Sequence, residues 1–343
     1  MEAQGVETLV PASDTAVVGL SEVAAKLANI ARAYILLSRI LKQCKPSLLI
    51  LIDFPEFNLK VASKAKKFGV PIMYYISPQV WAWRPGRIKK IASLVDRMVC
   101  ILPFEEKFYR ERGVAVDYVG HPILDAIPSH VSSHEIRQRF GVEGAYPVIG
   151  IAPGSRDHEV DALLPLMMAA AQRLAERYTG LTCLLPLAPT IEEGKIKAMA
   201  AHTALRIKIC RESIYEVFSC CDCAMVASGT ATLECAIMEV PMVVAYKVSP
   251  LSFFLAKRLV KVDHICLVNL VAGEEVVPEL IQDEITPGSL EKHLVTLLED
   301  EAERERMLRG LRKVKELLGG GGASRRAAQI AISLINSAGT PDK

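Results

Sequence analysis

The sequence has almost no excess charge of either sign. Its 343 residues carry 41 lysines and arginines against 39 aspartates and glutamates, which gives a net charge of +2. Nucleic-acid binding needs a strongly basic surface, which this balance does not supply. The longest apolar runs are of strand length or are broken by Arg or Lys, so we expect no transmembrane helix. The first residues, MEAQG, have neither the basic start nor the apolar stretch of a signal peptide.

The cysteines lack the spacing of a metal site or of a disulfide framework. There are nine of them, and the cluster Cys220-Cys221-Asp222-Cys223 has no second ligand pair at a finger-like distance. An odd number of cysteines within apolar segments is typical of free thiols in a reducing compartment. The sequence therefore predicts a cytoplasmic protein without a bound metal.

Apolar strands and helices alternate along the chain in two series. The strands are continuous apolar runs, which is typical of parallel sheets covered by helices on both faces. The chain is long enough for two domains. We therefore expect an α/β protein of two doubly wound domains with a cleft between them, in which ligands bind at the carboxyl ends of the strands. The expected strands lie near 48–52, 71–76, 95–101, 116–119, 147–152, 181–187, 205–210, 222–227 and 242–247.

The expected domains are residues 1–146 and 147–318, followed by a C-terminal segment, 319–343, that crosses back to the first domain. The polar span 128–146 is interpreted as the linker. A charged helix is expected over 289–317, and a last helix at 324–337 follows four glycines. Residues 1–47 supply no buried strand, although a domain of this type normally opens with one.

Residues 223–247 indicate a nucleotide site. An apolar strand is followed by Ser228-Gly229-Thr230 and then by a helical pattern from Ala231 to Met238. A helix that begins at such a turn directs free N–H groups and the positive end of its dipole toward a phosphate. Glu234 lies on the same helix face as Thr230, where a carboxylate suits the hydroxyls of a ribose.

A second turn, Pro153-Gly154-Ser155-Arg156, follows the expected strand 147–152. Small residues let the backbone approach an anion, and the forked guanidinium of Arg156 suits phosphate. Such a turn is common in proteins when it occurs alone. Together with the turn at 228–230 it predicts that two strand ends face one diphosphate.

Three places in the first domain are candidates for ligand contacts. Asp53 ends a strand, where its carboxylate can act as a general base or cap the next helix. Trp81, Trp83 and Arg84 either bind a sugar or phosphate group or form a packed aromatic loop. His121 lies at a strand end and is either structural or a ligand contact.

Residues 20–45 have apolar residues at helical spacing and an excess of Lys and Arg. A helix of this kind lies on an anionic membrane surface or packs on the sheet. A second basic and aromatic segment, 249–261, adds to the indication of a membrane surface.

Several motifs follow one another along the chain: SPQVWAWRPGRIKKI, LPFEEKFY, VGHPILDA, APGSRDHEV, ASGTATLECA, PMVVAYK, and LAKRLVK followed by NLVAG. Together they resemble the lipid-A-disaccharide synthase family. The resemblance implies the GT-B fold, with two Rossmann-like domains facing across a cleft. It also implies an inverting glycosyltransferase that moves 2,3-diacylglucosamine from UDP to 2,3-diacylglucosamine 1-phosphate and gives a β(1→6) disaccharide. The implied partners are these two substrates and the cytoplasmic face of the inner membrane; a homodimer is compatible with the family, and no cofactor or metal is expected.

The resemblance implies roles for individual residues. Asp53 matches an acid that the family needs for activity and is the expected general base. The donor is expected to contact Gly154, Ser155, Arg156, Ser228, Gly229, Thr230, Glu234 and Asn269. The acceptor is expected to contact Trp81, Trp83, Arg84 and His121.

The family also opens with a strand and a Gly-Glu-Thr-Ser-Gly-Asp loop, and this sequence has neither. The first βαβ unit is therefore expected to be absent. Two alternatives follow from these observations: a truncated, catalytically impaired remnant that binds UDP, and a UDP-sugar epimerase of the same fold.

Overall fold

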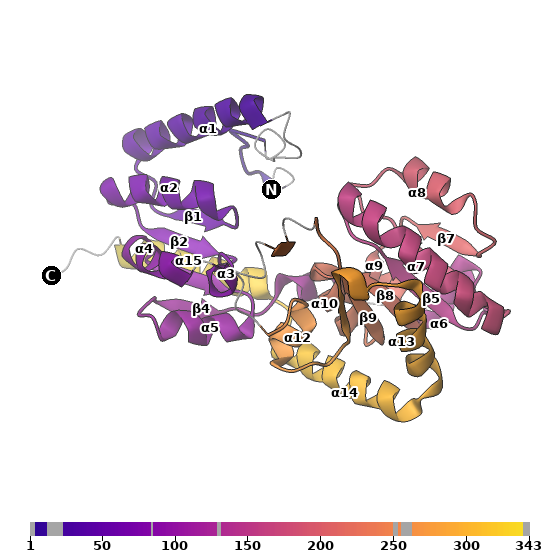
Figure 1. Cartoon of the computed structure of the whole chain (residues 1–343). Helices are drawn as coiled ribbons and strands as arrows, with labels where there is room; N and C mark the ends of the chain where they lie inside the picture. The colour runs from indigo at the N-terminus through magenta and orange to yellow at the C-terminus, as the bar shows by residue number, and fades with distance from the viewer. Residues whose placement is uncertain are drawn as a thin grey trace. The chain divides into compact units, whose positions relative to one another are not determined.

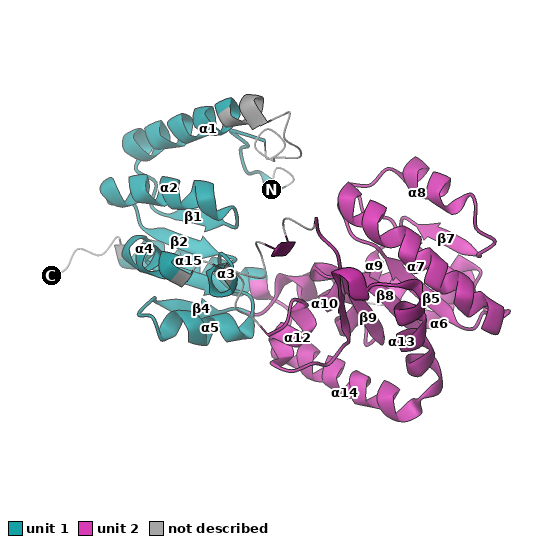
Figure 2. Cartoon of the chain, viewed as in Figure 1, with its two compact units in different colours: residues 1–119, 324–343 teal, residues 120–323 magenta. Residues whose placement is uncertain are grey.

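The computed structural model describes residues 4–11, 23–83, 85–128, 132–249, 253–254 and 263–338. Contacts divide the chain into two compact units, shown in Figure 2. Unit 1 comprises residues 1–119 and 324–343, and unit 2 comprises residues 120–323. Each unit is built on one parallel sheet with helices (Figure 1), which confirms the predicted α/β class.

The sheet of unit 1 has four strands in the order β1-β2-β3-β4, all parallel. Prolines at the first turns of α2 and α5 fit helix starts, where no N–H is needed. The strands are β1 (Leu49–Ile52), β2 (Ile72–Tyr75), β3 (Arg97–Cys100) and β4 (Val116–Tyr118). The helices are α1 (Val23–Cys44), α2 (Pro55–Lys67), α3 (Val80–Trp83), a 3-10 turn (Pro85–Arg87), α4 (Ile88–Leu94), α5 (Pro103–Arg110) and α15 (Ala323–Ala338).

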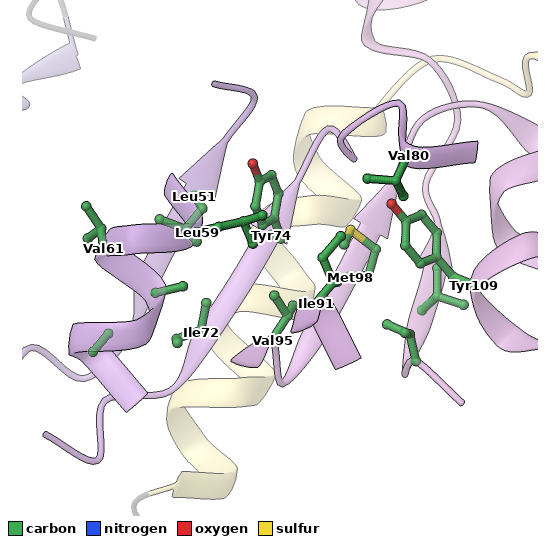
Figure 3. Close-up of a cluster of buried hydrophobic side chains, with 14 of the residues drawn as sticks. Leu51, Leu59, Val61, Ile72, Tyr74, Val80, Ile91, Val95, Met98 and Tyr109 are labelled. Atoms are coloured by element: carbon green, nitrogen blue, oxygen red, sulfur yellow. The ribbon is translucent and has the colours of Figure 1, made fainter. Parts of the chain in front are cut away.

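Successive residues of these strands point to opposite faces of the sheet, and each face has its own core. Ile72 and Tyr74 face a cluster that includes Leu59 of α2 and Ile91 of α4, as Figure 3 shows. On the other face, α15 covers the sheet. There Met73, Val99 and Val119 pack against Ala327 and Ala331. Helix α15, near the C-terminal end of the sequence, therefore covers one face of the sheet to which β1 belongs.

The sheet of unit 2 has six parallel strands in the order β10-β9-β8-β5-β6-β7. This is the order of a dinucleotide-binding sheet, in which the chain reverses direction between its two central strands. Ligands of such sheets bind outside the carboxyl ends of the strands at that switch point, which here lies between β5 and β8. The strands are β5 (Val148–Ala152), β6 (Thr182–Pro186), β7 (Ile207–Cys210), β8 (Cys223–Ala227), β9 (Met242–Tyr246) and β10 (Glu279–Ile281).

Near the end of unit 2 the helices differ from the prediction. The helix expected over 289–317 is two helices, because the carboxylate of Asp300 accepts the Glu303 N–H at 3.1 Å and starts a new one. The helices are α6 (Ser133–Phe140), α7 (Asp157–Arg177), α8 (Glu193–Ala200), α9 (Ile214–Ser219), α10 (Thr230–Ile237), α12 (Leu267–Ala272), α13 (Pro287–Glu299) and α14 (Glu301–Leu317), with 3-10 turns at Pro122–Ala126 and Gln282–Glu284.

The span 128–146, which the sequence suggested as a linker, contains part of the core of unit 2. Ile136 and Phe140 of α6 are buried with Val148 and Val217. Because these contacts join α6 to the sheet, the compact units separate between residues 119 and 120 and not at residue 146. The polar composition of the span reflects the exposed side of a short helix.

Helix α1 packs against α2, and its Leu41 is buried in the core of unit 1. Tyr34 and Leu37 pack against the same cluster. Among the described residues, no helix has the length and apolar content that crossing a bilayer requires. The segment 249–261, the second basic segment noted in the sequence, lies mostly outside the described residues.

Candidate functional site

The two predicted anion-binding turns follow neighbouring strands of unit 2. β5 pairs with β8, and β8 pairs with β9 on its other side. The pairing continues past the end of β8, where the Ser228 N–H donates to the Ala245 carbonyl at 2.9 Å. The turns at 153–156 and 228–230 therefore both lie at the switch point of the sheet.

The turn after β8 presents free hydrogen-bond donors. Gly229 is the N-cap residue of α10 and has no side chain that could accept the N–H groups of the first turn. Its carbonyl accepts from Thr232, at 2.7 Å from Oγ1 and 3.2 Å from N. Among the described residues, the N–H groups of Gly229, Thr230 and Ala231 have no acceptor. Unpaired N–H groups at the positive end of a helix are suited to an anion.

Glu234 lies one turn into the same helix. Its side chain is half-buried, and burial raises the pKa of its carboxyl. Its carboxylate makes no hydrogen bond or ion pair with any described residue. Tyr215 is nearby: its hydroxyl donates to the Ile123 carbonyl at 3.0 Å, and burial, with a smaller effect of Glu234, raises its pKa to about 12. A partly desolvated carboxylate without a partner is suited to ligand hydroxyls.

The turn after β5 is occupied by a side chain that the sequence did not single out. Glu159 accepts the N–H of Ser155 at 3.0 Å and that of Arg156 at 3.3 Å, and its other oxygen pairs with Arg156 Nη1 at 2.8 Å. Gly154 has φ +119, and a Cβ there would collide with Glu159. The main-chain donors predicted at Ser155 are thus already used, because Glu159 takes the place of an external anion.

Arg156 remains available to a ligand. Its side chain is 71% exposed, and Glu159 takes only one of its guanidinium nitrogens. Burial raises the pKa of Tyr246, the last residue of β9. The charge of Glu159 adds to this shift and the charge of Arg156 opposes it, so the ion pair of Arg156 and Glu159 lies close to the end of β9. The geometry therefore favours a diphosphate held by the N–H groups of α10 and by the free guanidinium edge of Arg156.

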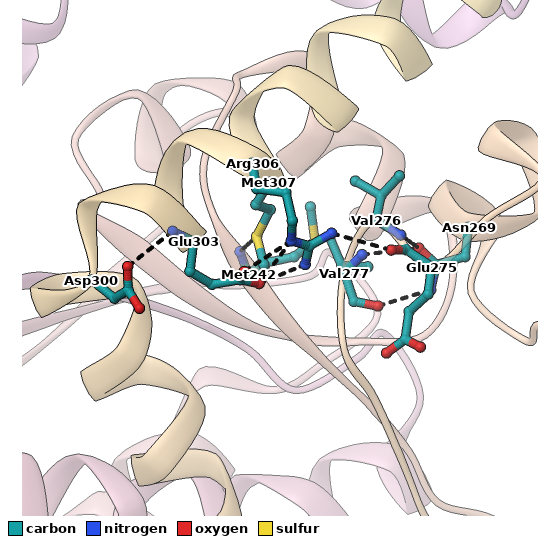
Figure 4. Close-up of polar contacts among 9 residues, drawn as sticks. All are labelled: Met242, Asn269, Glu275, Val276, Val277, Asp300, Glu303, Arg306 and Met307. Atoms are coloured by element: carbon teal, nitrogen blue, oxygen red, sulfur yellow. Dashed lines mark hydrogen bonds and ion pairs between the residues drawn. The ribbon is translucent and has the colours of Figure 1, made fainter.

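Asn269, predicted to contact the donor, is fully buried and has no free hydrogen-bonding atom. Its Oδ1 accepts the N–H groups of Val276 and Val277 at 2.8 and 3.0 Å. Its Nδ2 donates to the Val277 carbonyl at 2.8 Å and to Glu279 at 2.7 Å. Figure 4 shows Asn269 beside the loop that it holds. Asn269 therefore holds the loop at 276–277 in place, because that loop folds back onto the side-chain amide.

Asp53 follows β1 in an unusual backbone conformation. Asp53 and Phe54 have φ of 47° and 43°, in the left-handed region that residues other than glycine rarely adopt. The bend is fixed by the Asp53 carbonyl, which accepts from Asn58 Nδ2 at 2.6 Å and from the Tyr74 hydroxyl at 2.7 Å. The carboxylate itself is exposed and has no partner among the described residues. Strain of this kind is concentrated at functional sites.

The remaining acceptor candidates have different surroundings. Trp81 is half-buried, and its Nε1 donates to Glu105 at 3.0 Å. Arg84 and the side chain of Trp83 lie outside the described residues. His121 is only 6% exposed, and its Nδ1 accepts the Ile123 N–H at 3.1 Å. Burial lowers the pKa of His121 to about 4, so its imidazole is neutral at pH 7. The imidazole caps the turn that follows it and is not exposed as a ligand contact would need to be.

Three glutamates that accept hydrogen bonds from these loops were not predicted from the sequence: Glu105, Glu159 and Glu279. Glu159 and Glu105 both lie in the first turn of a helix, three residues after the N-cap. Glutamate at that position is half of the capping-box signal, and the Ser or Thr that completes the signal is absent, because the N-cap residues are Arg156 and Leu102. Glu279 gave no such signal, because it lies on a strand too short to recognise.

A sheet of this order, with unpaired N–H groups of a helix start at its switch point, gives unit 2 the Rossmann-like architecture of the GT-B class. Solved structures of that class are similar to the whole chain. The UDP complex of S. aureus MnaA has a TM-score of 0.61 at 15% identity and covers 94% of this chain and 84% of its own. CalG4, the calicheamicin glycosyltransferase, has a TM-score of 0.55 at 15% identity and covers 94% and 83%. At this identity the likeness concerns the fold alone, and it confirms the predicted fold class.

The chain belongs to the lipid-A-disaccharide synthase family. The family model described as lipid-A-disaccharide synthetase matches residues 1–333. The lipid-A-disaccharide synthase of Geobacter metallireducens is 47% identical over 335 residues, which are 98% of this chain and 87% of the relative. The family predicted from the motifs is thus confirmed. The comparisons support the transferase and give no support to the impaired remnant or the epimerase.

Proposed function

We propose that this chain transfers 2,3-diacylglucosamine from UDP to 2,3-diacylglucosamine 1-phosphate, giving the β(1→6)-linked disaccharide 1-phosphate and UDP. The observation that carries the proposal is the family match over residues 1–333. The reaction needs a site for a nucleoside diphosphate and a base for a hydroxyl. The described residues offer candidates for both.

Unit 2 is the proposed donor domain. The unpaired N–H groups of Gly229, Thr230 and Ala231 would bind the diphosphate, and Arg156 would neutralise its charge as UDP leaves. Glu234 would accept hydrogen bonds from the ribose hydroxyls. Gly154 and Ser155 contribute indirectly, through the turn that places Arg156.

Asp53 is the proposed general base. Its carboxylate takes the proton from the 6-hydroxyl of the acceptor, and that oxygen forms a bond to C1 of the donor sugar. The bond between C1 and the β-phosphate oxygen breaks, and UDP leaves with the electron pair. A single displacement inverts the configuration at C1, which turns an α-linked donor into a β-linked product. The fixed bend at Asp53 keeps the carboxylate exposed for this task.

Helix α1 supports a membrane surface as a further partner. Its outward face exposes Ile35 (50%) and Leu36 (37%) among Arg32, Arg39 and Lys42, and the helix contains no acidic residue. Exposed aliphatic side chains among cations suit an anionic lipid surface. Substrates that carry acyl chains are themselves held in such a surface. A homodimer stays a prediction.

The substitution Asp53→Asn tests the proposal. We expect the turnover of UDP-2,3-diacylglucosamine and the acceptor to fall by ~10³-fold or more, because the amide cannot take the proton, while UDP still binds. Asp117→Asn is the matched control, since Asp117 lies on the opposite edge strand of the same sheet and pairs with Arg97. Near-normal turnover of the Asp53 variant would exclude Asp53 as the base.

The unmodified chain must be assayed first. Formation of the disaccharide, detected by mass spectrometry, is the expected result. UDP binding without any product would favour the impaired remnant instead. Epimerised sugar formed from UDP-N-acetylglucosamine alone would favour the epimerase.

A further inference from the structure

Glu105 is a buried carboxyl group with no part in the proposed reaction. Its side chain is 2% exposed, and it lies in the first turn of α5, directly after β3. Burial raises the pKa of Glu105, and its hydrogen bonds oppose this shift. A carboxylate is rarely buried unless hydrogen-bond donors surround it. The residues that donate to Glu105 therefore show which parts of the fold it connects.

Three donors meet at Glu105, from two different loops. Its Oε1 accepts from Ser77 Oγ at 2.5 Å and from Trp81 Nε1 at 3.0 Å. Its Oε2 accepts the N–H of Leu102 at 3.1 Å. Ser77 and Trp81 follow β2, and Leu102 follows β3, which is the neighbouring strand. Glu105 therefore joins two loops at the carboxyl edge of the sheet of unit 1.

Trp81 is held from a second side as well. Its ring packs edge-on against Phe104, with ring centroids 4.8 Å apart and planes at 85°. The indole is thus fixed by one hydrogen bond and one ring contact, both from the start of α5. Trp81 is itself one of the residues predicted to contact the acceptor. Asp53, the proposed base, lies at the carboxyl edge of the same sheet.

We propose that Glu105 is a positioning residue for acceptor binding: it holds the indole of Trp81 at the carboxyl edge of the sheet, in the orientation that receives the glucosamine 1-phosphate. This inference rests on the proposed function and deepens it. It assigns to a buried residue the geometry of the acceptor site, whereas the donor site in unit 2 does not depend on it.

The alternative is that Glu105 only caps α5. Glu105→Gln leaves one oxygen acceptor, so either the Leu102 N–H or Trp81 Nε1 then faces an amide NH₂ group. Trp81→Phe separates the two roles, because it removes the donor of the indole and leaves the hydrogen bond from Leu102 to Glu105 in place. An equal loss in both variants, which does not grow in the double variant, indicates that the bond between Glu105 and Trp81 is what matters.

The experiment compares Glu105→Gln, Trp81→Phe, the double variant and Glu106→Gln in steady-state transferase assays. Glu106→Gln is the matched control, because within the described part of the chain the carboxylate of the neighbouring Glu106 pairs with Arg110 alone. We expect the acceptor KM to rise by ~10-fold in the first two variants, as for the loss of one hydrogen bond to a charged group. The donor KM should not change, and the double variant should be no worse than either single variant.

A second readout does not depend on activity. In a Trp83→Phe background, the fluorescence of Trp81 reports on its own surroundings. Glu105→Gln should shift its emission, and Glu106→Gln should not. An unchanged acceptor KM in an active Glu105→Gln enzyme would overturn the inference, as would a donor KM that rises equally. If the unmodified chain forms no disaccharide, the proposed function fails instead, which is a different outcome.

Discussion

Replacing Asn269 by alanine distinguishes a structural residue from a ligand contact. The substitution leaves the buried N–H groups of Val276 and Val277 without their acceptor. Each buried donor that loses its partner costs about 1–3 kcal/mol, so we expect the free energy of unfolding to fall by about 2–6 kcal/mol. In a unit of this size that is a drop of roughly 5–15 °C in melting temperature.

Two optical probes can assign this loss to unit 2. Both tryptophans lie in unit 1, so their fluorescence reports on that unit, whereas far-UV circular dichroism reports on both. We expect the circular-dichroism transition to move to lower temperature. UDP affinity should fall only as far as the folded population falls. An unchanged melting curve together with weak UDP binding would refute this reasoning and restore Asn269 as a ligand contact.

The variant Asn269→Asp adds a test by pH. It keeps an acceptor for both N–H groups but places a second carboxyl group beside Glu279, 2.7 Å from the present Nδ2. Burial and the neighbouring charge raise the pKa of the new group in the folded state. Relative to the unmodified chain, the variant should therefore lose stability as pH rises through that pKa. A stability that rises with pH over the same range would contradict the buried geometry.

The remaining predictions concern three other places. His121, with a pKa of about 4 when folded, should cost stability as pH falls below its usual 6.5, by ~3 kcal/mol at pH 4. Urea titrations should show this loss, and His121→Asn should remove it. Gly154→Ala should destabilise unit 2 by ~1–3 kcal/mol and weaken UDP binding, because its Cβ collides with Glu159; calorimetry should detect both. Ile35→Asp with Leu36→Asp should abolish sedimentation with anionic vesicles but leave turnover of detergent-dispersed substrates unchanged.

The central strands of unit 2 could be predicted because their side chains are apolar throughout. Val148–Ala152 and Cys223–Ala227 are buried at every position, so the sequence shows them as unbroken apolar runs. β10 was missed, since its three residues begin with Glu279 and carry no such run. Its place in the sheet follows from pairing with β9, which is a contact distant in sequence.

The site was predictable where one segment determines it. The turn at Ser228–Thr230 needs only a strand, small residues and a helix start, and it is present as expected. The role of Asn269 depends on residues seven and eight positions away that fold back onto it. No local sequence pattern indicates that a loop folds back onto a side chain in this way. The bend at Asp53 was also unpredictable, since aspartate and phenylalanine rarely adopt left-handed backbone.

The position of α15 has a consequence for how the protein is made. Met73, Val99 and Val119 form the sheet face that Ala327 and Ala331 cover. On the ribosome, these strands emerge early, and their covering helix emerges only after all of residues 120–323. Unit 2 can complete its fold while unit 1 still shows an apolar surface to the cytosol. A nascent chain of this protein therefore exposes an apolar sheet face until α15 has been synthesised, which is the kind of surface that favours aggregation.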